Sequence, residues 1–309
     1  MKKPVVSVVV PTYRRSETLV RALESLAEQS YQDFEIIVVD DNDDENWNRT
    51  VSSIVDSFRD SYPSISLQLE QNHPNQGSAK SRNIGIDLSQ GEYITFLDDD
   101  DLYLPDKIRN QLNAMIKSEA DYSLMDLSLF YENESLCEIR TRDYLLDPKE
   151  KNNLLVCHLK YHLTGTDTMM FRTSYIRSFG GFEAIDVGDE FYLMLKAIEA
   201  KGVFVYCRTC DVKAYVHTCE GGLSSGQQKI GGEKRLFAFK KRFLKDLAFK
   251  DRRYIKMRFY AVLAFAYKRS NKRLMYLISG IKAVCTAPIQ SMLLVNRIRL
   301  SKKRIAKQK

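Results

Sequence analysis

Four consecutive aspartates at residues 98–101 carry the clearest chemical signal in the sequence. They come directly after the apolar residues 93–97, which have the length and composition of a buried strand. Neighbouring carboxylates repel one another unless a cation or hydrogen-bond donors offset their charge. Carboxylate oxygens suit hard ions such as Mg²⁺ and Mn²⁺, which proteins often share with substrate phosphates. An acidic cap on the next helix would also explain the aspartates, so the cluster alone leaves both interpretations open.

Two further segments carry polar residues at the ends of predicted elements. Asp40 and Asp41 end a second apolar run, residues 34–39, and this repetition favours a ligand site over a helix cap. Residues 75–83 bring Gly77, Lys80 and Arg82 to the start of a predicted helix, where a phosphate or a base edge can bind. A permissive loop before a capped helix with solvated cations is the alternative, because the segment lacks a complete phosphate-loop or dinucleotide motif.

Asp189 and Glu190 stand at the start of a predicted apolar helix. Acidic residues are common at helix N-termini because they interact favourably with the helix dipole. In a cleft, one of these carboxylates can instead act as the general base on an acceptor hydroxyl.

The predicted elements explain how these residues come together. Strands alternate with helices through the first hundred residues, which predicts a parallel sheet with right-handed crossovers. Ligands bind beyond the carboxyl ends of such strands, where the polar residues cluster. From about residue 123 to residue 146 the pattern predicts antiparallel strands. We expect strands at residues 5–10, 34–39, 65–69, 93–97 and 168–171, and helices after residue 16, around residues 51–58, at residues 77–88, after residue 105 and at residues 188–201.

In order and content, these motifs resemble the family 2 glycosyltransferases of the GT-A fold. The motifs are VVVPTY at residues 8–13, VVDD at residues 38–41, the segment 77–85, GEYITFLDDDD at residues 91–101, Gly181-Phe182 and Gly188-Asp189-Glu190. The resemblance extends from residue 4 to about residue 220. It implies an α/β protein with a Rossmann-like mixed sheet. The catalytic domain would cover residues 1–230, with a nucleotide-binding half at about 1–101 and an acceptor half at about 102–230.

The resemblance also implies roles for individual residues in an inverting transfer. The cation, Mn²⁺ or Mg²⁺, would be held by Asp98 and Asp100, with His217 similar to a late histidine that contacts metal or diphosphate in some members; a structural histidine is the alternative. The nucleotide would contact Pro11, Thr12, Tyr13, Asp40, Lys80, Arg82, Asp98 and Asp99, with Asp40 reading the base. The family commonly has Glu-Asp where this chain has Asp189-Glu190. The usual base position therefore falls on Glu190, with Asp189 as the alternative.

The resemblance favours a nucleoside diphosphate sugar as donor, specifically a UDP-sugar, and so a hexosyl- or N-acetylhexosaminyltransferase. The expected acceptor is a lipid-linked saccharide in surface polysaccharide biosynthesis. A nucleotidyltransferase is the enzymatic alternative, but it would need a glycine-rich basic loop after the first strand, and residues 11–15 contain no glycine. A membrane-bound scaffold with a degenerate transferase domain is the other alternative, and the intact aspartates argue against it.

Charge divides the chain into two parts. Residues 231–309 contain 23 basic and three acidic residues, a net charge of +20, whereas residues 1–230 contain 24 basic and 37 acidic residues, a net charge of −13. Dispersed cations among interrupted apolar stretches predict a basic helical tail that lies on an anionic membrane surface, with Phe259, Phe265, Leu293 and Leu294 inserted. Nucleic acid is the alternative partner of so basic a segment. The acidic catalytic part favours the membrane, so we expect no nucleic acid.

The cysteines and the N-terminal sequence indicate the compartment. Six cysteines are spread thinly, and residues 5–10 are too short an apolar run for a signal peptide. We therefore expect a cytoplasmic protein that is peripheral on the inner face of the cell membrane. Cys207 and Cys210, with His217 and Cys219, have a spacing that could hold zinc. An isolated pair in a strand-rich stretch favours packing instead.

Overall fold

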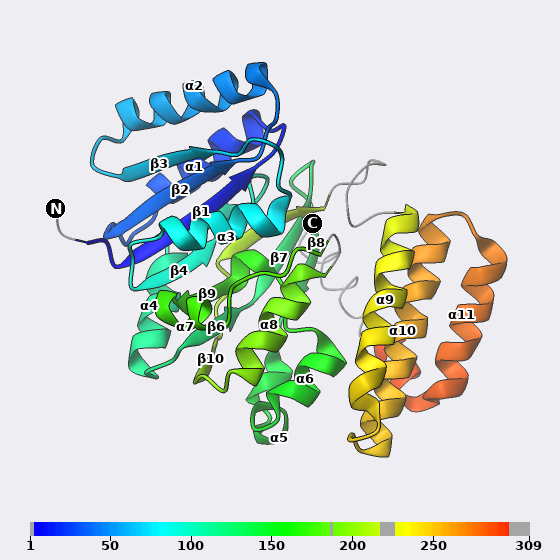
Figure 1. Cartoon of the computed structure of the whole chain (residues 1–309). Helices are drawn as coiled ribbons and strands as arrows, with labels where there is room; N and C mark the ends of the chain where they lie inside the picture. The colour runs from blue at the N-terminus through cyan, green and yellow to red at the C-terminus, as the bar shows by residue number, and fades with distance from the viewer. Residues whose placement is uncertain (1–2, 186–187, 217–225, 297–309) are drawn as a thin grey trace. The chain divides into compact units, whose positions relative to one another are not determined.

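The computed structural model describes residues 3–185, 188–216 and 226–296 (Figure 1). The chain forms two compact units. The first consists of Met1–Leu146, Leu163–Ile185 and Asp189–Val216, and the second of Asp147–His162, Asp186–Gly188 and His217–Lys309. Each unit therefore combines segments that are separate in the sequence.

A seven-stranded sheet forms the centre of the first unit. Its strands in chain order are β1 (Val6–Thr12), β2 (Phe34–Asp40), β3 (Ser66–Gln71), β4 (Tyr93–Phe96), β6 (Tyr122–Met125), β9 (Met169–Arg172) and β10 (Phe204–Cys207). Their order in space is β10-β6-β9-β4-β1-β2-β3. β9 runs antiparallel to both β4 and β6, and every other neighbouring pair is parallel. The mixed sheet expected from the sequence is confirmed.

The apolar runs of β1 and β2 place these strands in the middle of the sheet. Every residue of both strands is buried, as expected for strands that are covered on both faces. Their parallel register pairs Thr12 with Asp40 at the two carboxyl ends. Just beyond this pair, the Asp41 N–H donates to the Thr12 carbonyl oxygen at 2.9 Å. The strand ends that carry predicted site residues therefore lie side by side.

Six helices of the first unit follow or connect these strands. They are α1 (Glu17–Ala27), α2 (Glu45–Ser61), α3 (Ser78–Leu88), α4 (Lys107–Lys117), α7 (Thr173–Ser178) and α8 (Asp189–Glu199). The Asp41 carboxylate fixes the start of α3, because it accepts from Gln76 N at 2.7 Å and from Gly77 N at 2.8 Å. Gly85 lets α3 approach β1 closely, since a Cβ there would lie 2.2 Å from Val9 Cγ1.

A four-stranded sheet completes the first unit. Its strands are β5 (Leu102–Tyr103), β7 (Leu127–Tyr131), β8 (Leu136–Arg140) and β11 (Val212–Val216), in the order β5-β11-β7-β8. The 3-10 helices η1 (Asp143–Leu146) and η2 (Thr166–Thr168) lie in the connections. β7 and β8 form the antiparallel pair expected between residues 123 and 146, whereas β6 joins the large sheet and runs parallel to β10.

The second unit is helical. It contains α5 (Pro148–Lys151), α6 (Leu154–Tyr161), α9 (Gly226–Leu244), α10 (Phe249–Arg269), α11 (Arg273–Thr286) and a last helix, Pro288–Asn296. Figure 1 shows α9, α10 and α11 side by side. Lys240 of α9 donates to Leu159 O of α6 at 2.7 Å, so α6 packs with the C-terminal helices. The division predicted between residues 230 and 231 falls inside α9, and residues 147–162 group with the tail.

Among the described helices, none has the length and apolar character needed to cross a membrane alone. α11 and Pro288–Asn296 meet these criteria only as a pair, with a bend of 116° between them.

Candidate active site

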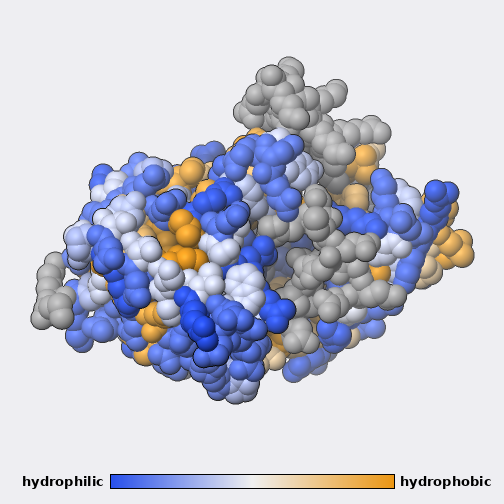
Figure 2. All heavy atoms as spheres, turned by 90° about the horizontal axis from the view of Figure 1, so that it is seen from above, coloured by the Kyte–Doolittle hydropathy of each residue, from blue (hydrophilic) through white to orange (hydrophobic). Residues whose placement is uncertain are grey.

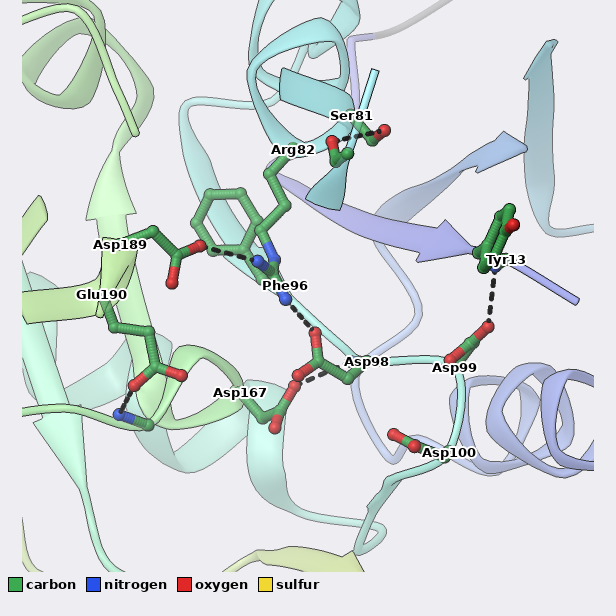
Figure 3. Close-up of polar contacts among 12 residues, drawn as sticks. Tyr13, Ser81, Arg82, Phe96, Asp98, Asp99, Asp100, Asp167, Asp189 and Glu190 are labelled. Atoms are coloured by element: carbon green, nitrogen blue, oxygen red, sulfur yellow. Dashed lines mark hydrogen bonds and ion pairs between the residues drawn. The ribbon is translucent and has the colours of Figure 1, made fainter. Parts of the chain in front are cut away.

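The acidic loop after β4 meets a third chain segment at Asp167 of η2. Asp98, Asp101 and Asp167 each offer a carboxylate oxygen, and these oxygens all lie within 4.8 Å of one another. The Asp98 N–H also donates to Asp167 Oδ1 at 2.7 Å (Figure 3). Three carboxylates at this spacing match the oxygen-rich ligand sets of Mg²⁺ and Mn²⁺.

Burial and mutual repulsion disturb the acid groups of this cluster. Burial, followed by the negative charge of Asp98, raises the pKa of Asp167 to about 8. Burial and the charge of Asp167 raise the pKa of Asp101 well above its usual value. A divalent cation would offset this charge and replace the protons, so the residues present fit such an ion.

The predicted cation ligands are only partly gathered in this cluster. Asp98 belongs to it, but Asp100 lies outside it and forms an ion pair with Arg15 at 3.1 Å. His217 lies outside the described residues. A role for Asp100 in binding the cation therefore stays a prediction, beside the alternative set of Asp98, Asp101 and Asp167.

Asp99 turns to the end of β1, where nucleotide contacts were predicted. Its Oδ2 accepts from Thr12 Oγ1 at 2.7 Å and from Tyr13 N at 3.2 Å. Burial and the neighbouring Asp100 raise the pKa of Asp99 to about 7. Pro11 is buried within β1, whereas 46% of Tyr13 is exposed. The exposed phenol ring can accept a planar ligand, and Asp99 holds its backbone in place.

Arg82 links the acidic loop to the start of α8. It reaches Asp98 Oδ1 at 2.5 Å and Asp189 Oδ2 at 3.2 Å, as Figure 3 shows. Burial opposes its charge, but Asp98 and Asp189 raise the pKa of Arg82 above its usual value. Lys80, also predicted to contact the nucleotide, is exposed and lies 3.4 Å from Gln76 Oε1. Of the two cations, Arg82 is therefore the one built into the site.

Asp189 and Glu190 have different surroundings although they are adjacent. Asp189 pairs with Arg82, whereas Glu190 Oε2 accepts from Gly165 N at 2.8 Å. Burial, followed by the charges of Asp189 and Asp98, raises the pKa of Glu190. Burial also raises the pKa of Asp189, against the opposing effect of Arg82.

Asp40 is fully buried at the end of β2. One carboxylate oxygen accepts from Asn42 N at 3.0 Å and Asn42 Nδ2 at 2.7 Å, and the other from Gln71 Nε2 at 3.3 Å. Burial raises the pKa of Asp40. A base could reach this carboxylate only if one of these donors moved, so base reading by Asp40 stays a prediction.

The cysteine pair shows separate contacts. Cys207 Sγ lies 3.5 Å from Thr209 Oγ1, and Cys210 Sγ lies 3.0 Å from Ser128 Oγ. Within residues 3–185, 188–216 and 226–296, the three aspartates are the one group of three or more potential metal ligands. His217 and Cys219 lie outside these residues.

Sequence reasoning missed Asp101 and Asp167 as members of the cluster. Asp101 was visible as the last residue of the acidic run, but the Asp-x-Asp resemblance directed attention to Asp98 and Asp100. Asp167 stands between two threonines, and no nearby motif marks it. Its position depends on β9 lying beside β4, a pairing that the local sequence does not specify.

Solved structures of glycosyltransferases share this fold. S. aureus TarS 1-349 in complex with UDP-GlcNAc matches with a TM-score of 0.55 at 17% identity, over 91% of this chain and 88% of that chain. Mannosyltransferase PcManGT from Pyrobaculum calidifontis, in complex with GDP-Man and Mn²⁺, matches with a TM-score of 0.59 at 18% identity, over 99% of this chain and 83% of that chain. The GT-A fold predicted from the sequence is confirmed.

Curated relatives match the N-terminal part of the chain. The amylovoran biosynthesis glycosyltransferase AmsB of Erwinia amylovora is 39% identical over 119 residues, which are 38% of this chain and 38% of AmsB. The GalNAc(5)-diNAcBac-PP-undecaprenol beta-1,3-glucosyltransferase of Campylobacter jejuni is 32% identical over 155 residues, 46% of this chain and 48% of that enzyme. The chain therefore spans less than half the length of these two relatives.

The family model for glycosyl transferase family 2 matches residues 7–179, which is more than half of the chain. The match includes Arg82 and all three aspartates of the carboxylate cluster, and it ends before Asp189 and Glu190. On this match, the chain belongs to glycosyl transferase family 2.

Proposed function

We propose that this chain is an inverting glycosyltransferase that moves a monosaccharide from a nucleoside diphosphate sugar to an acceptor hydroxyl. The observation that carries the proposal is the chain of contacts from the carboxylate cluster through Arg82 to Asp189 at the start of α8. A cation site suits a departing diphosphate, and a carboxylate with a raised pKa suits an incoming hydroxyl. Arg82 joins the cation site to Asp189, the residue directly before Glu190.

The division of labour follows from charge. A divalent cation held by Asp98, Asp101 and Asp167 would stabilise the negative charge that grows on the leaving diphosphate. Arg82 holds Asp98 in place and favours the ionised form of Asp189, against the effect of burial. Glu190 takes the proton from the acceptor hydroxyl as its oxygen attacks the anomeric carbon from the face opposite the diphosphate. A single displacement of this kind inverts the anomeric centre.

Glu190 fits the role of base better than Asp189 does. The ion pair with Arg82 stabilises the ionised form of Asp189 and so makes it a weaker base. Glu190 accepts one backbone hydrogen bond, from Gly165 N, and burial raises its pKa. A raised pKa brings a carboxylate closer to the working pH, where general bases are most effective.

A UDP-sugar is the proposed donor, and a hexose or N-acetylhexosamine the transferred group. TarS, which shares the fold, is described in complex with UDP-GlcNAc, whereas PcManGT is described with GDP-Man and Mn²⁺. The fold itself therefore accommodates both bases. The preference for uridine rests on the family resemblance of residues 8–13 and 38–41.

The proposed acceptor is a lipid-linked saccharide in surface polysaccharide biosynthesis. The Campylobacter jejuni relative is named for an acceptor linked to PP-undecaprenol. The Escherichia coli relative WfgD is 27% identical over 128 residues, and its name also gives an acceptor linked to diphosphoundecaprenol. The Erwinia amylovora relative is named for amylovoran biosynthesis.

The second unit supports a peripheral position on the inner face of the cell membrane. Four large apolar residues of α11 point to one side at helical spacing and are strongly exposed: Leu274 (70%), Leu277 (58%), Ile281 (63%) and Val284 (53%). Ile289, Met292 and Leu293 of the last helix are exposed as well. Figure 2 shows a group of orange, apolar residues at the right-hand edge of the view. So large an exposed apolar surface marks an interaction site.

Charge favours an anionic bilayer as the partner of this surface. The sequence has no Asp or Glu after Asp251, so residues 252–309 contribute only cations. A second copy would bring like charges together, and nucleic acid would leave the apolar face in water. Anionic lipid headgroups attract the cations while the acyl region accepts the apolar side chains.

Incubation of the full chain with a panel of sugar nucleotides and Mn²⁺ tests the function. We expect slow hydrolysis of one UDP-sugar, detected as UDP release, and acceleration by a lipid-linked saccharide. The anomeric configuration of the product, read by NMR, should be opposite to that of the donor. Retention of configuration, or no release from any sugar nucleotide, would contradict the proposal.

A further inference from the structure

Lys107, the first residue of α4, is fully buried in the core of the first unit. Lysine is rarely buried without partners. Its Nζ donates to Thr95 Oγ1 at 2.5 Å and to the Tyr103 hydroxyl at 2.8 Å. Burial lowers the pKa of Lys107 well below its usual value.

The two hydroxyls that accept from Lys107 direct their own protons elsewhere. Thr95 Oγ1 donates to Met169 O at 2.7 Å, and the Tyr103 hydroxyl donates to Phe96 O. The two hydroxyl oxygens are only 2.9 Å apart. This is hydrogen-bond distance, but each hydroxyl has a single proton, and donation of both protons to the carbonyl oxygens leaves none to share between the two hydroxyls. Lys107 supplies a hydrogen bond to each oxygen and so lets them remain close.

This network fastens the three chain segments that carry the carboxylate cluster. Thr95 and Phe96 end β4 directly before the acidic loop, and Tyr103 follows that loop in β5. Met169 follows η2, the element that contains Asp167. The Lys107 amine thus connects the strand before the acidic loop, the strand after it and the segment that follows Asp167. One turn further along α4, Gln111 Nε2 donates to Thr168 O at 2.8 Å and strengthens the same attachment.

We propose that Lys107 is a positioning residue for the divalent-cation site, an inference that rests on the proposed function. The Lys107 amine bonds to Thr95 and Tyr103, and so acts through them on the carboxylates. It holds the backbone on which Asp98, Asp101 and Asp167 stand, so that their oxygens keep a common spacing. Groups that orient metal ligands typically change metal affinity by about 10- to 100-fold when they are mutated.

Lys107→Met tests this role, because it keeps the length of the side chain and removes both hydrogen bonds. Mn²⁺ binding to the full chain is measured by electron paramagnetic resonance, with and without UDP. We expect the dissociation constant for Mn²⁺ to rise by about 10- to 100-fold. Thr95→Val removes one of the two acceptors at similar volume and should cause a smaller rise. Thr95→Ser keeps the hydroxyl and should restore binding close to that of the wild type.

Met115→Ala is the matched control. Met115 is fully buried in the same helix, and its truncation should lower the melting temperature without weakening Mn²⁺ binding. If Lys107→Met loses stability as Met115→Ala does but binds Mn²⁺ like the wild type, Lys107 serves packing alone and the proposal is wrong. If Lys107→Met does not fold, unchanged Mn²⁺ affinity in Thr95→Val overturns it.

The same titration separates this inference from the proposed function. A wild-type chain that binds no Mn²⁺ under either condition would overturn both the cation site and the role of Lys107. A wild-type chain that binds Mn²⁺ but transfers no sugar would contradict only the proposed function.

Discussion

Arg82 shows how single residues divide their work in this site. Its guanidinium joins Asp98 of the acidic loop to Asp189 of α8, and both contacts are largely shielded from water. Breaking a buried ion pair by removing one partner typically costs about 3–5 kcal/mol, because the other charge stays buried. Arg82 therefore holds two elements together, and its contact with Asp189 is the reason that we propose Glu190 as the base.

At the same scale, Glu190→Gln should lower turnover by about 100- to 10,000-fold, the usual contribution of a general base. The substitution keeps size and hydrogen bonding, so donor binding should change little. Because the pKa of Glu190 is raised, wild-type turnover should fall on the acidic side at a higher pH than an ordinary glutamate, with a pKa of about 4.3, would cause. The pH profile of kcat measures this limb, and Asp189→Asn is the comparison. If Asp189→Asn is inactive and Glu190→Gln is nearly as active as wild type, Asp189 is the general base instead of Glu190.

A second residue-scale prediction separates the two candidate ligand sets of the cation. Asp167→Asn should abolish Mn²⁺ binding and transfer, because it removes one of three clustered carboxylates. Asp100→Asn should weaken the ion pair with Arg15 and reduce transfer less severely. Calorimetric titration of Mn²⁺ into both variants is the measurement. If Asp100→Asn loses the cation and Asp167→Asn keeps it, the ligand pair implied by the resemblance is correct instead.

The positions of the candidate site residues were predictable from the sequence where they follow a strand directly. Thr12, Asp40 and Asp98 each end or follow a run of buried apolar residues, and parallel strands bring such ends to one edge. The partners of these residues were not predictable. Asp167 depends on the pairing of β9 with β4 across about seventy residues of chain, and the burial of Asp40 depends on the conformation of Asn42 and Gln71.

At the scale of elements, α3 positions Arg82 by packing closely on β1. Gly85 has no side chain, and this allows the helix to approach Val9. The helix itself was predicted at residues 77–88, and its observed bounds, Ser78–Leu88, differ by one residue. The close approach was not predictable, because a glycine inside a helical pattern does not reveal what it faces. Likewise, the strand at residues 122–125 was expected among antiparallel strands, and it does pair antiparallel with β9, but its other partner is the parallel strand β10, eighty residues further on.

Gly85→Ala should therefore destabilise the protein by about 1–3 kcal/mol, as is usual for overpacking in a core. The added methyl would meet Val9 Cγ1 at 2.2 Å and push α3 away from β1. Gly280→Ala is the matched control in α11, where an added Cβ meets nothing within 4 Å. Its better helix propensity should stabilise that helix by up to about 1 kcal/mol. Thermal unfolding followed by circular dichroism compares the two. Equal melting temperatures of Gly85→Ala and wild type would mean that β1 moves to accommodate the methyl group with no loss of stability.

At the scale of the whole molecule, the charge division predicted from the sequence separates an acidic catalytic unit from a basic helical one. The predicted insertion residues need correction in part. Phe265 and Leu293 are exposed, but the Phe259 ring stacks on Phe237 with centroids 4.0 Å apart, and Leu294 packs against the cluster around Met257. Sequence composition identified the tail as amphipathic, whereas its outward face depends on how α10 and α11 pack together.

Leu277→Glu combined with Ile281→Glu should remove most binding to vesicles that contain anionic lipid. Both residues are exposed on one face of α11, and each should contribute roughly 1 kcal/mol of insertion. Co-sedimentation at low and high salt is the measurement. Wild type should keep a salt-resistant bound fraction, because salt screens only the attraction between charges.

The control for this experiment introduces two glutamates at exposed apolar positions of the first unit. Ile116 and Val203 are also exposed apolar residues, and Ile116→Glu with Val203→Glu should leave vesicle binding unchanged. Equal pelleting of wild type and the α11 variant, or no pelleting of wild type, would mean that this face binds something other than a membrane.

The ribosome makes the segment Asp147–His162 long before it makes α9 and α10, on which α6 of this segment packs. Ribosomes add about 5–20 residues per second, so roughly 4 to 18 s separate the synthesis of Tyr161 from that of Phe249. The first unit can close once β11 has been made, while α6 still awaits α9 and α10, the helices that it contacts. A chain interrupted in that interval would carry a finished catalytic unit and an uncovered apolar helix. Chaperones and proteases that survey nascent chains would recognise such a product by α6.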